Sequence, residues 1–405
     1  MKIAAVISEY NPFHNGHKYQ IDEIRKIHGD DTAVIAIMSG NFTQRGELAI
    51  FNKHIRAKAA IYGGVNLVLE LPFPYSMSSA EFFAKAGVYI ADRIGVVDYL
   101  YFGSECGDVE KLSEIARNLA SDAFTSEIKT AVADRDNQEI GYPAIMESVY
   151  RKLFGDELTA GFFSPNNILA IEYIKALTAM NSRVEPMTVK RVGAGYKQQD
   201  ITESPEQSAT AIRKLLRDSN ETAYNYVPKN VKTILIQENA TGDIISDPCA
   251  LDHAVIAKFR MNPPDAECNI HDAAGGLYNR LYACGMRTNS ISSLISEAET
   301  KKFTKARISR AVWNAFFSVT SSDLKANPAY TQVLAMDEIG QTVLKRIKKM
   351  SGFPVITKPA SYRKYGDEVI LRREISDRAD SVYELTLKNR TDGLSPLTFT
   401  PFVKK

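Results

Sequence analysis

The 405-residue sequence predicts an α/β fold with a parallel sheet in its first half, followed by a mainly helical and basic second half. Short apolar runs of strand length alternate with helical stretches up to about residue 220, which is typical of a doubly wound sheet. Beyond that point helical patterns dominate. A composition of 44% hydrophobic and 24% charged residues is that of an ordinary globular protein, long enough for two or three domains.

The first half contains five strand-like segments that are separated by helical ones. The expected strands are Lys2–Ser8, Thr32–Met38, Val65–Leu71, Val97–Phe102 and Val184–Val192. The expected helices are His17–His28, Lys53–Tyr62, Ser78–Ile94, Asn167–Met180 and Ser208–Asp218. The polar, helical stretch 105–160 interrupts this alternation, and we interpret it as an insertion.

We therefore expect a catalytic domain at 1–220 and a mainly helical domain at 221–405. The expected helices of the second domain are Leu251–Met261, Ala273–Gly285, Ser290–Glu299 and Phe303–Val319. The first domain carries 24 Lys and Arg against 28 Asp and Glu, a net charge of −4, and the second carries 26 against 20, a net charge of +6. Residues 301–364 hold 13 basic and 3 acidic side chains, which suits either a polyanionic partner or a solvated helical face.

Several classes of protein are excluded by motifs that the sequence lacks. Four widely spaced cysteines give neither a disulfide framework nor a zinc signature, and no GxxxxGK[ST] segment is present. We expect no protein-bound metal. No apolar run is long enough to span a membrane, and the N-terminal run reads as a strand, so a cytoplasmic location without membrane contact is expected.

The strongest functional signal is His14-Asn15-Gly16-His17, which opens a helix directly after the first strand. The N-terminus of such a helix presents free backbone N–H groups and the positive end of the helix dipole. Imidazole donors beside it, with a glycine that permits close approach, can hold a triphosphate and stabilise charge on an α-phosphate. The alternative is a pair of histidines that cap a surface turn.

A second signal is Ser208-Ala209-Thr210-Ala211-Ile212-Arg213, where hydroxyl groups begin a helix and Arg213 follows one turn later. Such hydroxyls can bind phosphate oxygens, and Arg213 can stabilise their charge. An ordinary helix cap with a surface arginine is the alternative. Glycine-bracketed residues 39–47 form a third candidate, in which Gln44 and Arg45 could contact a small carboxylate or a phosphate, or simply lie on a solvated loop.

Taken together, these segments resemble the HIGH-motif nucleotidyltransferases, and more narrowly the tRNA(Met) cytidine acetate ligase family. The resemblance rests on SEYNPFHNGH at 8–17, MSGNFTQRGE at 38–47, ELPFPYS at 70–76, YFGSE at 101–105, SPNNILAIEYIKAL at 164–177 and SATAIRKLL at 208–216. It implies a Rossmann-like core that activates acetate with ATP and acetylates the wobble cytidine of elongator tRNA(Met) to N4-acetylcytidine. ATP, with Mg²⁺ carried on the nucleotide, and acetate would be the small substrates.

The resemblance also implies which residues bind and act. Catalysis would rest on His14, His17 and Arg213. The ATP site would comprise Ile7, Ser8, Glu9, Tyr10, Asn11, Pro12, Phe13, His14, Asn15, Gly16, His17, Lys18, Tyr19, Gln20, Gly103, Asn167, Arg191, Ser208 and Thr210.

The basic second domain would dock tRNA, and its candidate contacts are Lys305, Arg307 and Arg310, which share roughly one side of a predicted helix. Two other functions remain open from the residues alone. One is a small-molecule adenylyltransferase of nucleotide-cofactor synthesis, and the other is a non-catalytic RNA-binding protein with a vestigial nucleotide fold. The oligomeric state is not predicted.

Overall fold

The computed structural model of the protein describes residues 1–134, 141–155, 163–191, 208–241, 244–264, 269–388 and 398–405. Its centre is an eight-stranded sheet with the strand order β5-β4-β1-β2-β3-β6-β7, in which β8 also pairs with β6. The five strands of the first half run parallel to one another. They are β1 Ile3–Ser8, β2 Ala33–Ser39, β3 Leu67–Leu71, β4 Tyr99–Ser104 and β5 Glu185–Lys190.

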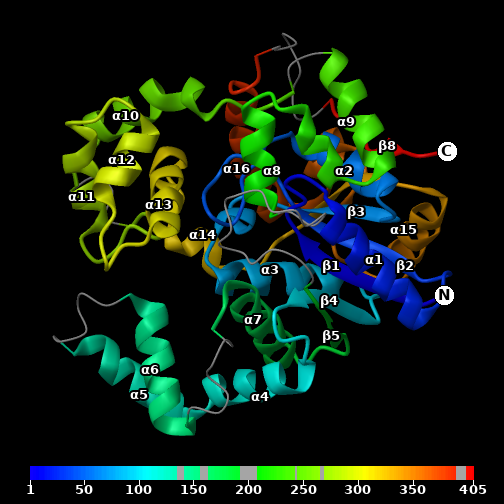
Figure 1. Ribbon diagram of the computed structural model, residues 1–405, viewed down its shortest axis with the longest axis horizontal. Helices are drawn as coiled ribbons and strands as arrows, with labels where there is room; N and C mark the ends of the chain where they lie inside the picture. Colours follow the sequence, from blue (N-terminus) through cyan, green and yellow to red (C-terminus); the bar gives the residue numbers. More distant parts are fainter. Residues whose placement is uncertain (135–140, 156–162, 192–207, 242–243, 265–268, 389–397) are drawn as a thin grey trace.

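The central strands are apolar on both faces, because helices cover both sides of the sheet. Successive side chains of a strand point to opposite faces, so Ile3 and Ala5 enter one buried cluster while Ala4 and Val6 enter another. One layer packs α3 and α7 on the sheet, and the other packs α1, α2, α8 and α9 (Figure 1). These helices span α1 Asn15–His28, α2 Lys53–Tyr62, α3 Ala80–Arg93, α7 Pro165–Ala179, α8 Ala209–Arg217 and α9 Lys229–Thr241.

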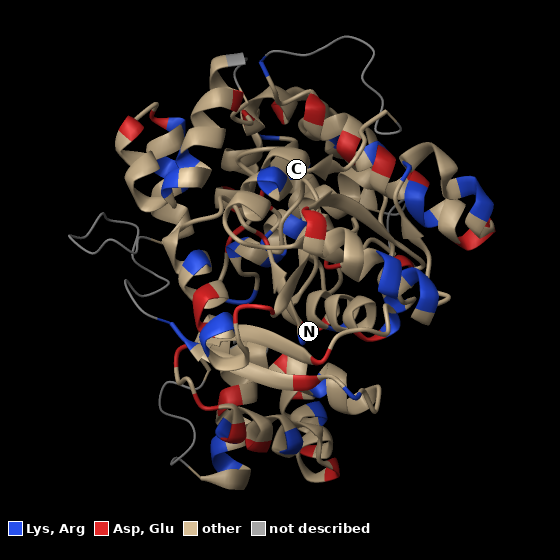
Figure 2. Ribbon diagram, turned by 90° about the vertical axis from the view of Figure 1, so that its right-hand side faces the viewer, with Lys and Arg blue, Asp and Glu red and all other residues tan. Residues whose placement is uncertain are grey.

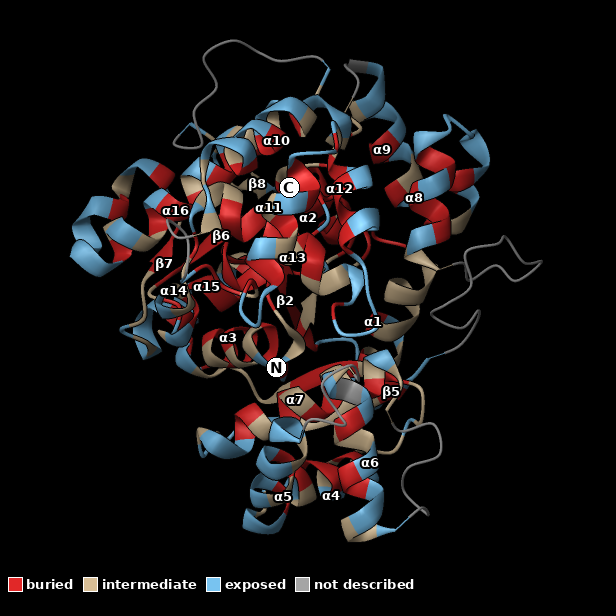
Figure 3. Cartoon of the chain, turned by 90° about the vertical axis from the view of Figure 1, so that its left-hand side faces the viewer, coloured by how far each residue is buried: buried red, intermediate tan, exposed pale blue. Residues whose placement is uncertain are grey.

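Between β4 and α7 the described residues form three helices that project from the sheet. They are α4 Val109–Ala120, α5 Asp122–Ala133 and α6 Tyr142–Phe154. A second helical group follows the core helices, with α10 Asp252–Met261, α11 Leu277–Gly285, α12 Ile291–Ala298, α13 Lys305–Phe317 and α14 Ser321–Lys325. Figure 3 shows that buried residues follow the sheet and the inner helices, whereas the outer faces of both helical groups are exposed.

The second half of the chain is not helical throughout, because it returns to the central sheet. Strand β6 Thr331–Met336 pairs antiparallel with β3, with Leu67 opposite Met336, and it carries β7 Val355–Ile356 and β8 Phe402–Val403 beside it. Helices α15 Glu338–Met350 and α16 Asp367–Glu384 flank these strands. The apolar run TQVLAM is short and stands alone among helical patterns, so periodicity gave no sign of its pairing with β3.

A buried ionic cluster joins α16 to the first half of the chain. The Lys53 ammonium lies 2.7 Å from a Glu70 oxygen and 2.5 Å from an Asp380 oxygen, and the side-chain amide of Asn41 donates to Asp380 at 2.9 Å. These four side chains come from α2, β3, α16 and the loop after β2. A boundary drawn at residue 220 therefore cuts through a shared core rather than between two separate bodies.

Candidate functional site

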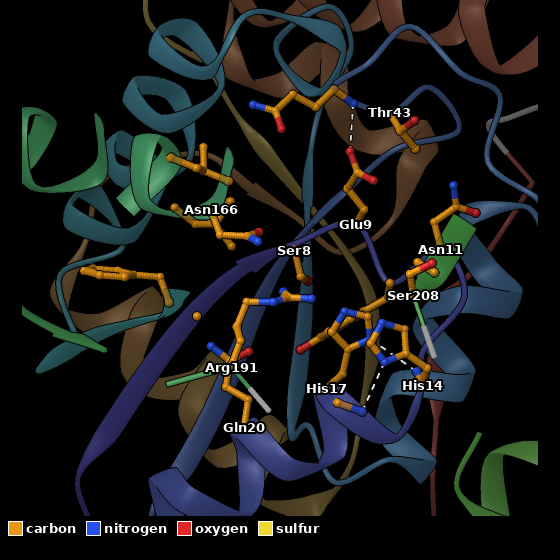
Figure 4. Close-up of a pocket in the computed structure, with 18 of the residues that line it drawn as sticks. Ser8, Glu9, Asn11, His14, His17, Gln20, Thr43, Asn166, Arg191 and Ser208 are labelled. Carbon is orange, nitrogen blue, oxygen red and sulfur yellow. Dashed lines mark hydrogen bonds between the residues drawn. The ribbon is translucent and has the colours of Figure 1, made fainter. Parts of the chain in front are cut away.

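A cavity of about 230 Å³ opens at the carboxyl ends of β1 and β4. From this point β2 and β3 continue the sheet in one direction and β5 in the other. Such a reversal of strand order creates a crevice at which open α/β sheets bind ligands. Figure 4 shows that side chains from β1, α1, the loop after β2, β5 and α8 enter this crevice.

The first turn of α1 carries two stacked histidines whose ring centroids are 3.8 Å apart. His14 is the N-cap residue, and its Nδ1 accepts a hydrogen bond from the Gly16 backbone N–H at 3.1 Å. His17 reaches back, and its Nδ1 accepts from the His14 backbone N–H at 3.2 Å. The pair thus forms a capping box made of imidazoles, in which each ring uses Nδ1 as an acceptor.

Both rings are neutral at physiological pH. Burial, helped by the positive charges of Arg191 and Arg213, lowers the pKa of His14 to about 3. Burial also lowers the pKa of His17 well below its ordinary value, with further contributions from His14 and Arg191. A neutral imidazole whose Nδ1 accepts must carry its proton on Nε2. Each histidine that lines the cavity is therefore a fixed Nε2–H donor.

Arg213 on α8 is 8% exposed and faces the same cavity. Its guanidinium donates to the Asn11 carbonyl at 3.0 Å, to a Glu47 carboxylate oxygen at 3.0 Å and to the Thr210 hydroxyl at 3.3 Å. The helix begins at Ser208, whose hydroxyl accepts from the Ala211 N–H at 3.2 Å. These contacts hold a fixed positive charge in the wall of the cavity that the first turn of α1 also lines.

Glu9 follows β1 and lies on the other side of the cavity from the histidines (Figure 4). One carboxylate oxygen accepts from the Gln44 backbone N–H at 2.9 Å. The backbone carbonyl of Glu9 accepts a hydrogen bond from the Arg56 guanidinium at 2.5 Å. The same buried guanidinium also donates to the carbonyls of Ser39 and Gly40. Arg56 thereby fixes the ends of β1 and β2 against each other, which sets the position of Glu9.

The sequence and the structure of the chain match those of known proteins. The sequence model of the HIGH Nucleotidyl Transferase family matches residues 1–394. The tRNA(Met) cytidine acetate ligase of Acetivibrio thermocellus is 36% identical over 402 residues, which is 96% of each chain. The protein of the same name from Caldanaerobacter subterraneus is 37% identical over 394 residues, again 96% of each chain. The chain belongs to the tRNA(Met) cytidine acetate ligase family.

Solved structures agree with this assignment. The chain matches Thermotoga maritima TmcAL bound with alpha-thio ATP with a TM-score of 0.91 and 29% identity, over 100% of this chain and 99% of that one. The apo form I of the Thermotoga protein matches with a TM-score of 0.93. Membership of the ligase family makes the chain an enzyme, and the α/β nucleotidyltransferase core that the sequence predicted is confirmed.

In this family member the cavity gathers most of the residues that the sequence analysis named. Those that line it are Ile7, Ser8, Glu9, Tyr10, Asn11, His14, Gly16, His17, Tyr19, Gln20, Gly103, Arg191, Ser208, Thr210, Arg213, Gln44 and Arg45. A Cβ at Gly103 would lie 3.2 Å from the Arg191 side chain, so the glycine lets this side chain pack closely over the end of β4.

Five residues named for the ATP site do not line the cavity: Pro12, Phe13, Asn15, Lys18 and Asn167. Phe13 is fully buried, and its ring packs directly against Gly63, where a Cβ would lie 2.4 Å from the ring. Lys18 pairs with Asp22 on the outside of α1. The Asn167 side chain is also buried and accepts from the Glu105 backbone N–H at 2.9 Å, so it holds the loop after β4 and leaves its neighbour Asn166 to face the cavity.

The sequence analysis missed other lining residues. They are Thr43, Glu47, Phe83, Phe102, Asn166, Leu169, Tyr173, Val189, Lys190 and Ala209. Glu47 could have been found, since it lies in the same glycine-bracketed loop as Gln44 and Arg45. The apolar members gave no signal, because an aromatic side chain on a helix reads equally well as core.

The three basic residues named on α13 have different environments. Lys305 is exposed. Arg307 donates to the carbonyls of Asp272 and Ala274 at 3.0 and 2.8 Å. Arg310 pairs with the Asp272 carboxylate at 2.7 Å. Two of the three charges are therefore engaged within the helical group, and none of the three lines the cavity.

The basic cluster at 301–364 is also divided in space. Lys301, Lys302 and Lys305 are exposed around the start of α13, whereas Lys345, Arg346, Lys348 and Lys349 are exposed on α15 at the opposite side of the molecule in Figure 1. Figure 2 likewise shows Lys and Arg interspersed with Asp and Glu on several elements of the face in view. The basic residues of 301–364 therefore form two separate groups, one beside the start of α13 and one on α15.

Within the described ranges, no group of three or more His, Cys, Asp or Glu side chains is placed to hold a metal ion. No helix in these ranges is both long and apolar enough to cross a membrane.

Proposed function

We propose that this enzyme activates acetate with ATP as acetyl-adenylate and then acetylates the wobble cytidine of elongator tRNA(Met) to N4-acetylcytidine. The observation that carries the proposal is the neutral imidazole pair at the first turn of α1, which lines the same cavity as Arg213. Two fixed N–H donors, a helix N-terminus and a guanidinium together suit the charge that develops on an α-phosphate. The names of the relatives supply the identity of the substrates.

In the first half-reaction an acetate oxygen attacks the α-phosphorus of ATP, and pyrophosphate leaves with the electron pair of the broken bond. Acetate is itself the nucleophile, so no side-chain nucleophile is required. His14 and His17 would donate to phosphate oxygens through Nε2–H, and Arg213 would offset the growing negative charge. Mg²⁺ would arrive with the triphosphate, whose oxygens are the ligands that this ion prefers.

In the second half-reaction the exocyclic amine of cytidine attacks the acetyl carbon, and AMP leaves. The helices of the second half would dock the tRNA mainly through its phosphates, with Lys305 as the exposed candidate on α13. Because tRNA is the acceptor, we place the reaction in the cytoplasm. Helix α13 reaches the cavity loop directly, since Trp313 Nε1 donates to the Gly46 carbonyl at 2.9 Å.

An ATP–pyrophosphate exchange assay tests the proposal. Exchange should require acetate, and labelled acetate should appear as N4-acetylcytidine after bulk tRNA is added and digested to nucleosides. Exchange that requires a nucleotide monophosphate or a similar small phosphate would instead identify a cofactor-forming adenylyltransferase. Absence of exchange with every carboxylate and phosphate offered would leave an RNA-binding protein.

A further inference from the structure

The second half-reaction releases a proton from the cytidine amine, and the cavity must contain a group that accepts it. This inference rests on the proposed function. The exocyclic amine of cytidine is a weak base, so its attack is aided by removal of a proton as the new bond forms. A proton acceptor has to be ionised or carry a free lone pair, and it must line the cavity in which the mixed anhydride is formed.

The histidines are unsuited to this step. Each has a basic nitrogen, Nδ1, but that atom already accepts a backbone N–H of the capping box. Releasing it would leave the first turn of α1 without the hydrogen bonds that cap it. The remaining nitrogen, Nε2, already carries a proton. The surroundings also oppose protonation, because burial lowers the pKa of both rings.

The hydroxyl groups of the buried Tyr10 and Tyr173 are equally unsuited. Burial raises the pKa values of Tyr10 and Tyr173 above their ordinary range, so both stay protonated at neutral pH. They can donate a hydrogen bond to a substrate but cannot accept its proton.

Among the described lining residues, carboxyl groups come from Glu9 and Glu47 alone. Glu47 is exposed, and an oxygen of its carboxylate lies 3.0 Å from the Arg213 guanidinium. That ion pair engages its carboxylate and holds it against α8. Glu9 is more sheltered, and one of its oxygens accepts from the Gln44 backbone N–H.

The surroundings of Glu9 favour a stronger base than a solvated glutamate. Burial raises the pKa of its carboxyl, and the nearby charge of Glu47 acts in the same direction. Arg213, the Gln44 N–H and Arg56 oppose this effect and keep the ionised form accessible. A carboxylate with a raised pKa is the form that general-base catalysis near neutral pH requires.

We propose that Glu9 is the general base that accepts the proton from the cytidine amine during acetyl transfer. The amine nitrogen forms a bond to the acetyl carbon, and one N–H proton passes to a carboxylate oxygen of Glu9. The bond from the acetyl carbon to the phosphate oxygen breaks, and AMP leaves with the electron pair. Glu9 then releases the proton to solvent, so the products are N4-acetylcytidine, AMP and one proton.

The test compares the two half-reactions in full-length Glu9→Gln. Glutamine keeps the oxygen that accepts from the Gln44 N–H but cannot take up a proton. Single-turnover transfer from preformed acetyl-adenylate to tRNA should fall on the order of a hundredfold more than acetate-dependent exchange falls. In the parent enzyme the transfer rate should drop as pH falls through the pKa of Glu9, because protonation removes the base, and Glu9→Gln should lose this dependence.

Two further variants keep the inference falsifiable. Glu9→Asp retains a carboxylate and should recover part of the transfer rate together with its pH dependence. Glu47→Gln removes the other carboxylate, which acts on Arg213, and should change exchange and transfer in parallel. If Glu9→Gln lowers both half-reactions equally, or if its transfer keeps the parent pH profile, Glu9 is not the base. If the parent enzyme shows no acetate-dependent exchange, the proposed function itself fails first.

Discussion

Helices α1 and α13 both reach the cavity region, but they do so in different ways. Helix α1 contributes its first turn, where two residues close together in the sequence, His14 and His17, both cap the helix and line the cavity. Helix α13 contributes its side, where Ser309 and Trp313 donate to the Gly46 carbonyl at 2.6 and 2.9 Å. We propose that the first helix supplies the chemistry, whereas the second holds the loop that lines the cavity.

This difference explains why the charges of the two helices behave differently. The charge stabilisers near α1 are neutral donors and one anchored arginine, all sheltered from solvent. On α13 the arginines bind groups of their own helical group, and the exposed lysine stands apart from them. A surface that binds a polyanion reversibly needs charges that are free to exchange partners, so exposure rather than charge count identifies the candidates.

The largest expected effect comes from removing a donor on α1. His17→Ala should lower acetate-dependent exchange by on the order of a hundredfold or more, because a fixed transition-state donor is lost. His28→Gln at the other end of the same helix serves as control, since His28 contacts Tyr101 and does not line the cavity. Thermal unfolding would show that both variants remain folded. Near-normal exchange in His17→Ala would contradict the role given to α1.

A second prediction concerns the loop where the two helices meet. A Cβ on Gly46, whose φ is +75°, would lie 2.5 Å from the Arg310 backbone nitrogen. Gly46→Ala should therefore push residues 43–47 away from α13 and lower exchange and transfer together, by roughly tenfold to a hundredfold.

Gly275→Ala provides a matched control for that substitution. Gly275 has a φ of +73°, but a Cβ there would meet nothing within 4 Å. It should cost about 1–2 kcal/mol of left-handed strain without an effect on exchange. Equal behaviour of the two variants would mean that strain, and not the close approach to α13, governs the loop.

The same contrast shows how far the sequence could predict the site. The α1 motif was recognisable because its strand, turn, histidines and glycine are consecutive and their spacing alone determines the capping geometry. Residues that act through distant partners were not recognisable. Glu47 meets Arg213 across 166 positions, Gly46 meets Trp313 across 267, and no local pattern indicates either contact.

Strand β6 failed to be predicted for the same reason. Its six residues carry an apolar run that a buried helix segment could also contain, and only the antiparallel pairing with β3 makes it a strand. The α13 arginines are a related case, because their engagement by Asp272 depends on the loop before α11. Local periodicity placed the helices that it named, but it missed α9, α15 and α16 and left the contacts between helices undetermined.

A rise in salt concentration should lower the acetylation of tRNA about tenfold or more beyond its effect on pyrophosphate release. Each phosphate contact of the docked tRNA should cost roughly threefold in affinity for a fourfold rise in salt, given a log–log slope of about −0.7 to −0.9 per contact. The contacts of ATP lie in a sheltered cavity where screening is weaker. Pyrophosphate release and acetylcytidine yield, measured side by side across a salt series, should therefore diverge. A parallel decline from the lowest salt upward would refute this division of labour.

The smallest expected effect, and the sharpest for placing the tRNA, comes from single exposed lysines. Lys305→Gln should weaken tRNA binding several-fold and reduce the salt slope by about 1, because one phosphate contact is lost. Exchange should be unaffected. Arg310→Gln should instead lower thermal stability, since it leaves the half-buried Asp272 carboxylate without its ion pair.

Lys349→Gln on α15 is the matched control, because Lys349 is equally exposed but lies on the far side of the molecule from α13. If tRNA docks beside α13, the salt slope of this variant should equal that of the parent enzyme. A slope reduced by Lys349→Gln and unchanged by Lys305→Gln would move the docking surface to α15. In that case α13 would act only as a support for residues 43–47, and the tRNA would have to reach the cavity past α1 instead.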